Sequence, residues 1–136
     1  MVTTFDPFFV TGHPKPKGSW TPLRTRDGKI KFRHASNKTA KWCVDAKEQV
    51  AVLWRGPILE GPIFVDLLFL LPRPKTVSRP YPTGKYDGDG DKLTRAMLDA
   101  MTGIVYVDDS QVIDWPGKKR YTDGTPGVWV TISTDL

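Results

Sequence analysis

The sequence contains one cysteine, two histidines and no apolar run close to the roughly 20 residues that a membrane-spanning helix needs. The single cysteine, Cys43, excludes an intramolecular disulfide, and its place on an apolar helical pattern favours a buried side chain over a nucleophile. His13 and His34 have no second ligand at metal spacing, so neither is interpreted as catalytic. We expect a protein of a reducing cytoplasm that is neither exported nor inserted in a membrane.

Several motifs of common enzyme classes are also missing. The sequence has no P-loop, no dinucleotide fingerprint, no G-x-S-x-G elbow, no zinc spacing and no internal repeat. We therefore expect no nucleotide cofactor and no hydrolysis by a side-chain nucleophile. With 136 residues, a net charge of +5 and a pI near 9.4, the sequence indicates one domain spanning residues 1–136 and a polyanionic partner.

The stretch from Asp87 to Asp114 has the opposite charge. It holds seven of the fifteen acidic residues, all of them aspartates, and two basic residues, so its net charge is −5 while the rest of the chain carries +10. Aspartate is a poor helix and strand former, and its short carboxylate suits a hard cation. This anionic centre inside a cationic chain is the main candidate for a functional site.

A helix is expected in the middle of this stretch. One side of it is apolar at i, i+3, i+4, i+7 and i+8, formed by Leu93, Ala96, Met97, Ala100 and Met101. Asp91, Arg95 and Asp99 follow one another at i, i+4 and i+8 on the opposite side, a spacing that favours ion pairs along a helix. Gly103 is the expected stop.

Acidic residues are expected at both ends of this helix. Asp89 and Asp91 lie at its start, where free N–H groups and the positive end of the dipole favour anions. The apolar run at 104–107 is short enough to return along the helix as a buried extended segment, and it leads to Asp108 and Asp109. The two acidic ends are therefore predicted to converge.

Three interpretations of the aspartate cluster compete. The first is a helix cap followed by a surface turn. The second is a calcium loop, in which Asp87, Asp89 and Asp91 match ligand positions 1, 3 and 5, but Lys92 stands where glycine is needed and Leu98 where a bidentate glutamate is needed. The third is a carboxylate-only magnesium site, which suits chemistry on phosphates.

The order of residues across the cluster carries a resemblance to a known family. The pattern consists of Asp89, Asp91, Leu93, Arg95, Asp99 and Ala100, followed by Asp108, Asp109, Ser110, Gln111 and Val112. It resembles the RusA family of Holliday junction resolvases and their phage relatives. Two positions differ from that family: Lys92 replaces its usual asparagine and Arg95 replaces its usual lysine, while Asp87 is extra to the pattern.

This resemblance implies a magnesium-dependent DNA endonuclease, with Mn²⁺ as a possible substitute, acting as a homodimer on four-way junctions. Paired symmetrical nicks would leave 5′-phosphate and 3′-hydroxyl ends. Arg95 would neutralise charge on the phosphoryl oxygens, with Asp99 holding it in place, and Leu98, apolar on the polar side of the helix, favours a dimer. The implied metal ligands are Asp89, Asp91 and Asp109, with Asp108 as an auxiliary ligand.

Two alternatives to junction resolution remain open. One keeps the nuclease and changes its substrate to flaps or replication forks. The other is a non-catalytic DNA-binding phage accessory protein that kept the fold, which the differences at Lys92 and Arg95 favour.

The expected fold is α+β, with a mixed sheet packed against two main helices. Strand 62–71 is almost unbroken apolar sequence, so we expect it to be buried on both faces, Asp66 excepted. Asp27-Gly28 predicts a two-residue turn in a basic hairpin, which is either a charged protective edge or a DNA contact. The other elements expected are strands at 8–12, 111–115 and 127–133 and a helix from Ser36 or Asn37 to about Trp54.

Basic residues outside the acidic stretch are the expected DNA contacts. Residues 72–86 contain four prolines, several basic residues and no acidic one, which predicts an exposed mobile loop or a solvated linker. Tyr81 and Tyr86 are expected to stack on bases. The predicted phosphate contacts are Lys15, Lys17, Arg73, Lys75, Arg79, Lys85, Lys118, Lys119 and Arg120.

Overall fold

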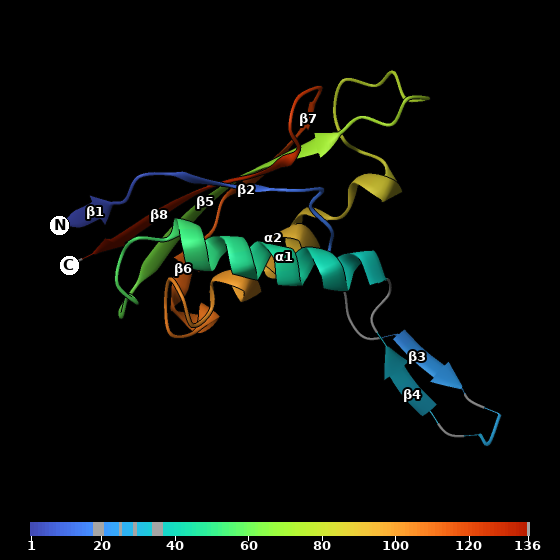
Figure 1. Cartoon of the computed structure of the whole chain (residues 1–136), viewed down its shortest axis with the longest axis horizontal. Helices are drawn as coiled ribbons and strands as arrows, with labels where there is room; N and C mark the ends of the chain where they lie inside the picture. Colours follow the sequence, from blue (N-terminus) through green and yellow to red (C-terminus); the bar gives the residue numbers. More distant parts are fainter. Residues whose placement is uncertain (18–20, 25, 29, 34–36, 136) are drawn as a thin grey trace.

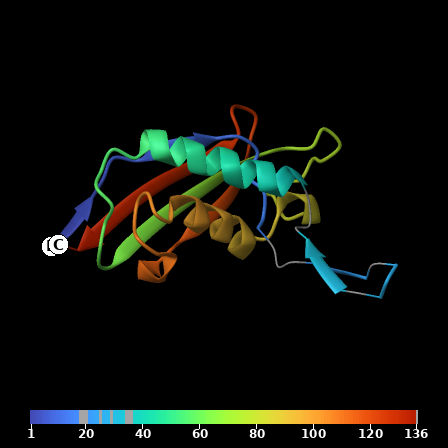
Figure 2. The same cartoon turned by 60° about the horizontal axis from the view of Figure 1, so that its bottom comes forward.

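The computed structural model describes the chain except residues 18–20, 25, 29, 34–36 and 136. Its main body is one mixed six-stranded sheet with two helices packed on the same face (Figures 1 and 2). The predicted α+β fold is confirmed. No helix in the described ranges is long and apolar enough to cross a membrane.

Two long antiparallel strands form the centre of the sheet, β5 (Ile63–Pro72) and β8 (Gly127–Asp135). The free edge of β8 is lined by β1 (Val2–Thr4) and then β2 (Phe8–Thr11), both antiparallel to it. The free edge of β5 is lined by β6 (Val112–Asp114) and β7 (Gly117–Thr122), both parallel to it. This order brings β7 next to the end of β5, where the chain leaves the sheet for the acidic stretch.

The core lies between the sheet and the helices α1 (Asn37–Leu53) and α2 (Gly90–Met101). The predicted apolar stripe of α2 is confirmed, because all five of its residues are buried. In β5 alternate residues are fully buried, but the others are half-buried or exposed, so burial on both faces is wrong. The reason is that both helices cover one face: on the other, Leu68 pairs with Trp129, which is 43% exposed.

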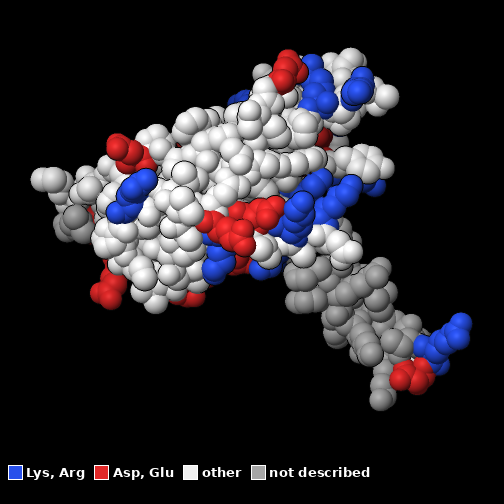
Figure 3. Space-filling view, viewed as in Figure 1, with Lys and Arg blue, Asp and Glu red and all other residues white. Residues whose placement is uncertain are grey.

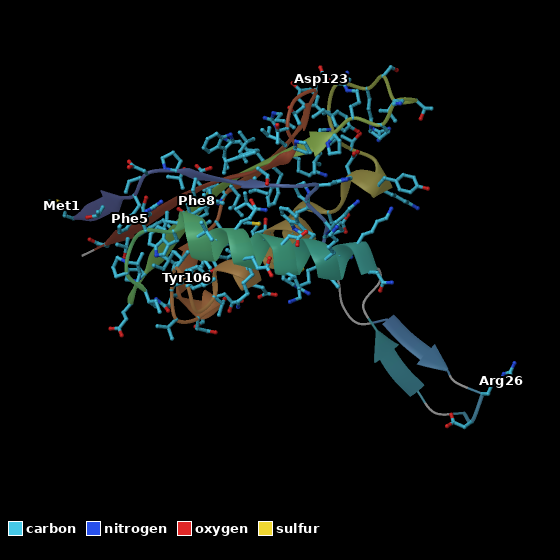
Figure 4. The ribbon with its side chains drawn as sticks, viewed as in Figure 1. Met1, Phe5, Phe8, Arg26, Tyr106 and Asp123 are labelled. Carbon is cyan, nitrogen blue, oxygen red and sulfur yellow. The ribbon has the colours of Figure 1, made fainter. Side chains whose placement is uncertain are left out.

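Two further expectations about strands need correction. Lys118-Lys119-Arg120, which lies between the strands expected at 111–115 and 127–133, is itself part of a further strand, β7. In the basic hairpin, β3 (Thr21–Arg24) pairs with β4 (Ile30–Arg33). The last pair among the described residues is Arg24 with Ile30, a register that centres the turn on Asp27 and does not fit a two-residue turn at Asp27-Gly28. The hairpin projects from the body, with Arg26 near its tip (Figures 1 and 4), and part of it lies outside the described residues.

Candidate active site on the polar face of α2

The chain enters α2 through a loop that is anchored on Asp87. Asp87 ends the short helix η1 (Lys85–Asp87), and its buried carboxylate accepts hydrogen bonds from Tyr121 Oη at 2.8 Å, Gly84 N at 2.8 Å and Arg79 at 3.1 Å. Burial alone would raise the pKa of Asp87, but the bonds from Tyr121, Gly84 and Arg79 outweigh it and hold that pKa below its usual value. Asp87 is therefore an anchor of the loop, and its Oδ2 atom already accepts three hydrogen bonds.

Strand β7 fixes the rest of the loop. Lys119 Nζ donates to the carbonyl oxygen of Gly88 at 2.9 Å. The guanidinium of Arg73 lies 5.1 Å from the ring centre of Tyr121, and that of Arg120 lies 5.5 Å from the ring centre of Tyr81. Most residues of the stretch 73–86 are exposed, as predicted, and three side chains of β7 contact the loop and hold it to the sheet.

Asp87 gives a stability prediction. Asp87→Ala leaves three donors without their acceptor in a buried place, so we expect unfolding free energy to fall by on the order of 2–4 kcal/mol in urea denaturation. Since its pKa is lowered on folding, this stabilisation is complete above about pH 4, the unfolded value, and disappears as the pH falls through the folded value. Asp123→Ala, in the exposed turn after β7 (Figure 4), is the control. Equal loss in both variants would contradict the anchor.

Gly88 makes the sharp turn from the anchored loop into α2. Its φ is +88°, and a Cβ there would lie 3.3 Å from both Leu93 and Pro16, so glycine fits both the backbone and the space. The turn places Asp89 at the N-cap, 69% exposed, with its carboxylate 3.5 Å from Lys92 Nζ and in no capping hydrogen bond. This exposed pair is weak, so Asp89 is accessible to a cation.

The polar face of α2 has a different pairing from the predicted one. Asp99 accepts a hydrogen bond from Lys17 Nζ at 2.7 Å, and Lys17 N donates to the carbonyl oxygen of Lys92 at 3.0 Å. Lys17 thus lies along α2 and neutralises Asp99. Asp91 and Arg95 are exposed and have no ion pair within the described part of the chain. The expectation that Asp99 holds Arg95 is wrong.

The return from α2 brings the second acidic pair to the same face. α2 ends before Gly103, whose φ of +82° is typical of a residue that stops a helix, as predicted. Buried Tyr106 (Figure 4) then donates its hydroxyl hydrogen to the carbonyl oxygen of Leu98 at 2.6 Å. Leu98 also packs against the core, so it does not support a dimer. Gln111 then fixes η2 (Asp109–Gln111): its Oε1 accepts from N of Val107 and Asp108 at 2.9 Å, and its Nε2 donates to two backbone carbonyls of residues 59 and 61.

Asp108 and Asp109 differ in their surroundings. Asp108 caps η2, and hydrogen bonds from Ser110 lower its pKa. The pKa of Asp109 is raised, first by burial and then by the nearby charges of Asp108 and Asp99. Asp109 lies within hydrogen-bonding reach of Asp99. The charge of Lys17 acts in the opposite direction and lowers the pKa of Asp109. The structure therefore brings together Asp99, Asp109 and Lys17, a group in which repulsion between carboxylates favours an added cation.

The predicted metal set is only partly assembled. The described residues contain no group of three or more His, Cys, Asp or Glu side chains placed to hold a metal. Asp91 precedes Asp99 by eight residues, about 12 Å along the helix axis, so Asp89 and Asp91 lie at the other end of the face from Asp109. Mg²⁺, however, is commonly held by one or two carboxylates together with substrate phosphates, and each end offers such a pair. The oxygen-only donors fit this ion.

The predicted phosphate contacts fall into two classes. Lys17, Arg79 and Lys119 are engaged with Asp99, Asp87 and Gly88, so they do not present free charges. The exposed cations are Arg73, Lys75, Lys85, Lys118 and Arg120, and Lys15 is half-buried beside α1. Tyr86 is 92% exposed beside the N-terminus of α2 and is available for stacking.

Sequence comparison gives two matches. A family model described as "Endodeoxyribonuclease RusA" matches residues 12–133, which include both acidic ends and α2. The chain is also 30% identical over 133 residues to a Bacillus subtilis (strain 168) protein named "Uncharacterized protein YqaN", covering 85% of this chain and 87% of that protein. The family match thus covers most of the chain and agrees with the resemblance seen in the aspartate pattern.

Proposed function

The chain belongs to the RusA endodeoxyribonuclease family, and from this we propose that it is a magnesium-dependent endonuclease that resolves four-way DNA junctions by paired symmetrical nicks. The observation that carries the proposal is the polar face of α2, where exposed carboxylates gather in a chain that is otherwise strongly cationic. Carboxylates at this density repel DNA unless a cation bridges them to phosphate.

The residues that would hold one or two Mg²⁺ ions are Asp89 and Asp91 at the start of α2 and Asp109 near its other end, with Asp108 as an auxiliary ligand. When bound, the ion would polarise the scissile phosphate and lower the pKa of the attacking water. Arg95 extends from the same face of α2 and would neutralise charge on the phosphoryl oxygens. Gln111 would keep Asp109 in place through its four hydrogen bonds to the backbone.

A cleavage assay tests this proposal directly. A labelled four-way junction, a flap and a linear duplex of matched sequence are incubated with the protein in Mg²⁺, Mn²⁺ or EDTA. We expect symmetrical nicks in the junction alone, ligatable products with 5′-phosphate and 3′-hydroxyl ends, and no cutting in EDTA. Preferred cutting of flaps would change the substrate and keep the nuclease.

A second candidate is a DNA-binding protein of this fold that does not cut. The pair of Lys17 with Asp99 favours it, because it neutralises one carboxylate of the acidic face without a metal. It predicts tight junction binding in EDTA and no cleavage with either metal.

Two symmetrical cuts require two sites related by a two-fold axis, so we expect a homodimer. Multi-angle light scattering at micromolar concentration should give about twice the 15.3 kDa chain mass. A monomer that still cuts both strands of a junction symmetrically would refute the dimer.

A further inference from the structure

A basic groove lies beside α1, outside the acidic face of α2. It has a volume of about 380 Å³ and is open to solvent. The segment after β2 forms one wall and the first half of α1 the other. Its charged and aromatic lining consists of His13, Lys15, Lys38, Lys41, Trp42 and Asp45.

The cations in this groove have no counter-ion of their own. Lys15, Lys38 and Lys41 form no ion pair with any side chain that the structure describes, and Asp45 is the sole carboxylate in the lining. The pKa of Lys15 is lowered, first by burial and then by the charge of Lys38. Such mutual repulsion is relieved by a bound anion, which explains why the lysines gather in a hollow.

The start of α1 adds to the attraction for an anion. The first turn contains no acidic residue, although acidic side chains are the ones favoured there, and Lys38 occupies that turn instead. The start of α1 therefore gives the groove a cation, Lys38, and no carboxylate that would compete with a phosphate. Buried Trp42 gives the groove a rigid wall.

The groove is connected to the acidic face by two residues of chain. Lys15 lies in the groove, while Lys17 bonds to Lys92 and Asp99 on α2. Two residues span at most about 7 Å, and successive phosphates of one strand advance about 3.4 Å along the duplex axis. Phosphates a few nucleotides apart on one strand are separated by a comparable distance. Figure 3 shows basic side chains gathered near the N-terminal end of α1, next to acidic side chains over the middle of that helix.

We propose that this groove binds a backbone phosphate of the same DNA strand whose scissile phosphate lies at α2. This inference rests on the proposed nuclease function and adds a binding site to it. Lysines bind phosphate as point charges without reading sequence, so the groove holds the strand in register whatever its bases.

The test compares two double variants of equal charge. Lys38→Ala with Lys41→Ala removes two groove cations, and Lys47→Ala with Arg55→Ala removes two exposed cations from the C-terminal half of α1 and just beyond it. Binding of a labelled junction is measured in EDTA between 50 and 200 mM salt. We expect the groove variant to bind about tenfold more weakly, with a slope of log K against log salt shallower by about 0.9, the value for one phosphate. The control should change binding less than about twofold and leave the slope unchanged.

Single-turnover cleavage of preformed complexes separates this inference from the proposed function. A groove variant that binds weakly but cuts at the normal rate once bound supports both. If wild type never cuts but the groove variant binds weakly, the groove is supported and the nuclease function is refuted. If wild type cuts but the groove and control variants bind equally well, the groove is refuted. Failure of the charge-preserving variant Lys38→Arg with Lys41→Arg to keep wild-type binding would also refute it.

Discussion

Asp89→Asn, Asp91→Asn and Asp109→Asn are each expected to lower single-turnover cleavage by about a thousandfold or more while junction binding in EDTA stays within about twofold of wild type. Each change removes one negative charge from a site that depends on metal-bound phosphate, where single electrostatic contacts are worth a hundred- to a thousandfold. Folding should survive, because the three carboxylates are exposed and none makes a strong ion pair.

The matched variant Asp99→Asn decides how the metal is held. If the ion binds at Asp89, Asp91 and Asp109, Asp99 is only the partner of Lys17, and Asp99→Asn should cost about tenfold or less. If the ion uses the pair of neighbouring carboxylates, Asp99 and Asp109, then Asp99→Asn should be as damaging as Asp109→Asn. Calorimetric titration with Mg²⁺ in the absence of DNA gives a readout that does not depend on activity.

Asp123→Asn serves as the control for charge, since Asp123 lies in the turn between β7 and β8 away from α2 (Figure 4). The assignment of all three ligands fails if any two of the three variants keep full activity at saturating Mg²⁺. Loss of folding in one variant, seen as a large drop in melting temperature, would instead mean that the carboxylate holds the structure, as Asp87 does.

The acidic helix was predictable because its signals are local. Within about fifteen positions the sequence shows an aspartate at the helix start, a helical repeat of apolar residues and a glycine at the stop. The bounds of both helices were predicted to within a few residues. Strand β7 was missed because its charged residues mask a period of two: Lys119 and Tyr121 are half-buried and bond to Gly88 and Asp87, while Lys118 and Arg120 are exposed. Their alternation with Lys118 and Arg120 was the available signal.

Pairing between distant segments was not predictable from spacing. Helical geometry favoured Asp99 with Arg95, four residues away, yet Asp99 pairs with Lys17, which is 82 residues away in the sequence. The fold makes this pair by laying the segment after β2 along α2, a contact that exists only once the sheet has formed. Lysine in the first turn of α1, where acid is usual, was the one sequence signal for the basic groove.

Arg95→Ala is expected to lower single-turnover cleavage of a preformed junction complex by a hundredfold or more, and Arg95→Lys by no more than about tenfold, or about 1.4 kcal/mol of barrier. Arg95 is exposed on the face between Asp91 and Asp99 and has no ion pair among the described residues, so its charge is free for phosphate. Arginine stays protonated at all working pH values, which means that it acts here as a charge and not as a proton donor.

Lys17 is the competing source of that charge. Its ammonium already lies at Asp99, next to Asp109, so it is placed to meet a phosphate at that end of the face. If Lys17 neutralises the phosphate, Lys17→Met should cost a hundredfold and Arg95→Ala less than about threefold, the reverse of our expectation. If Arg95 only pairs weakly with other side chains along the helix, it stabilises the fold by about 0.5 kcal/mol or less. Arg95→Ala would then cut at the wild-type rate and melt at a slightly lower temperature. Measuring both variants on the same preformed complex excludes differences in binding and product release, so the larger rate loss identifies which cation meets the phosphate.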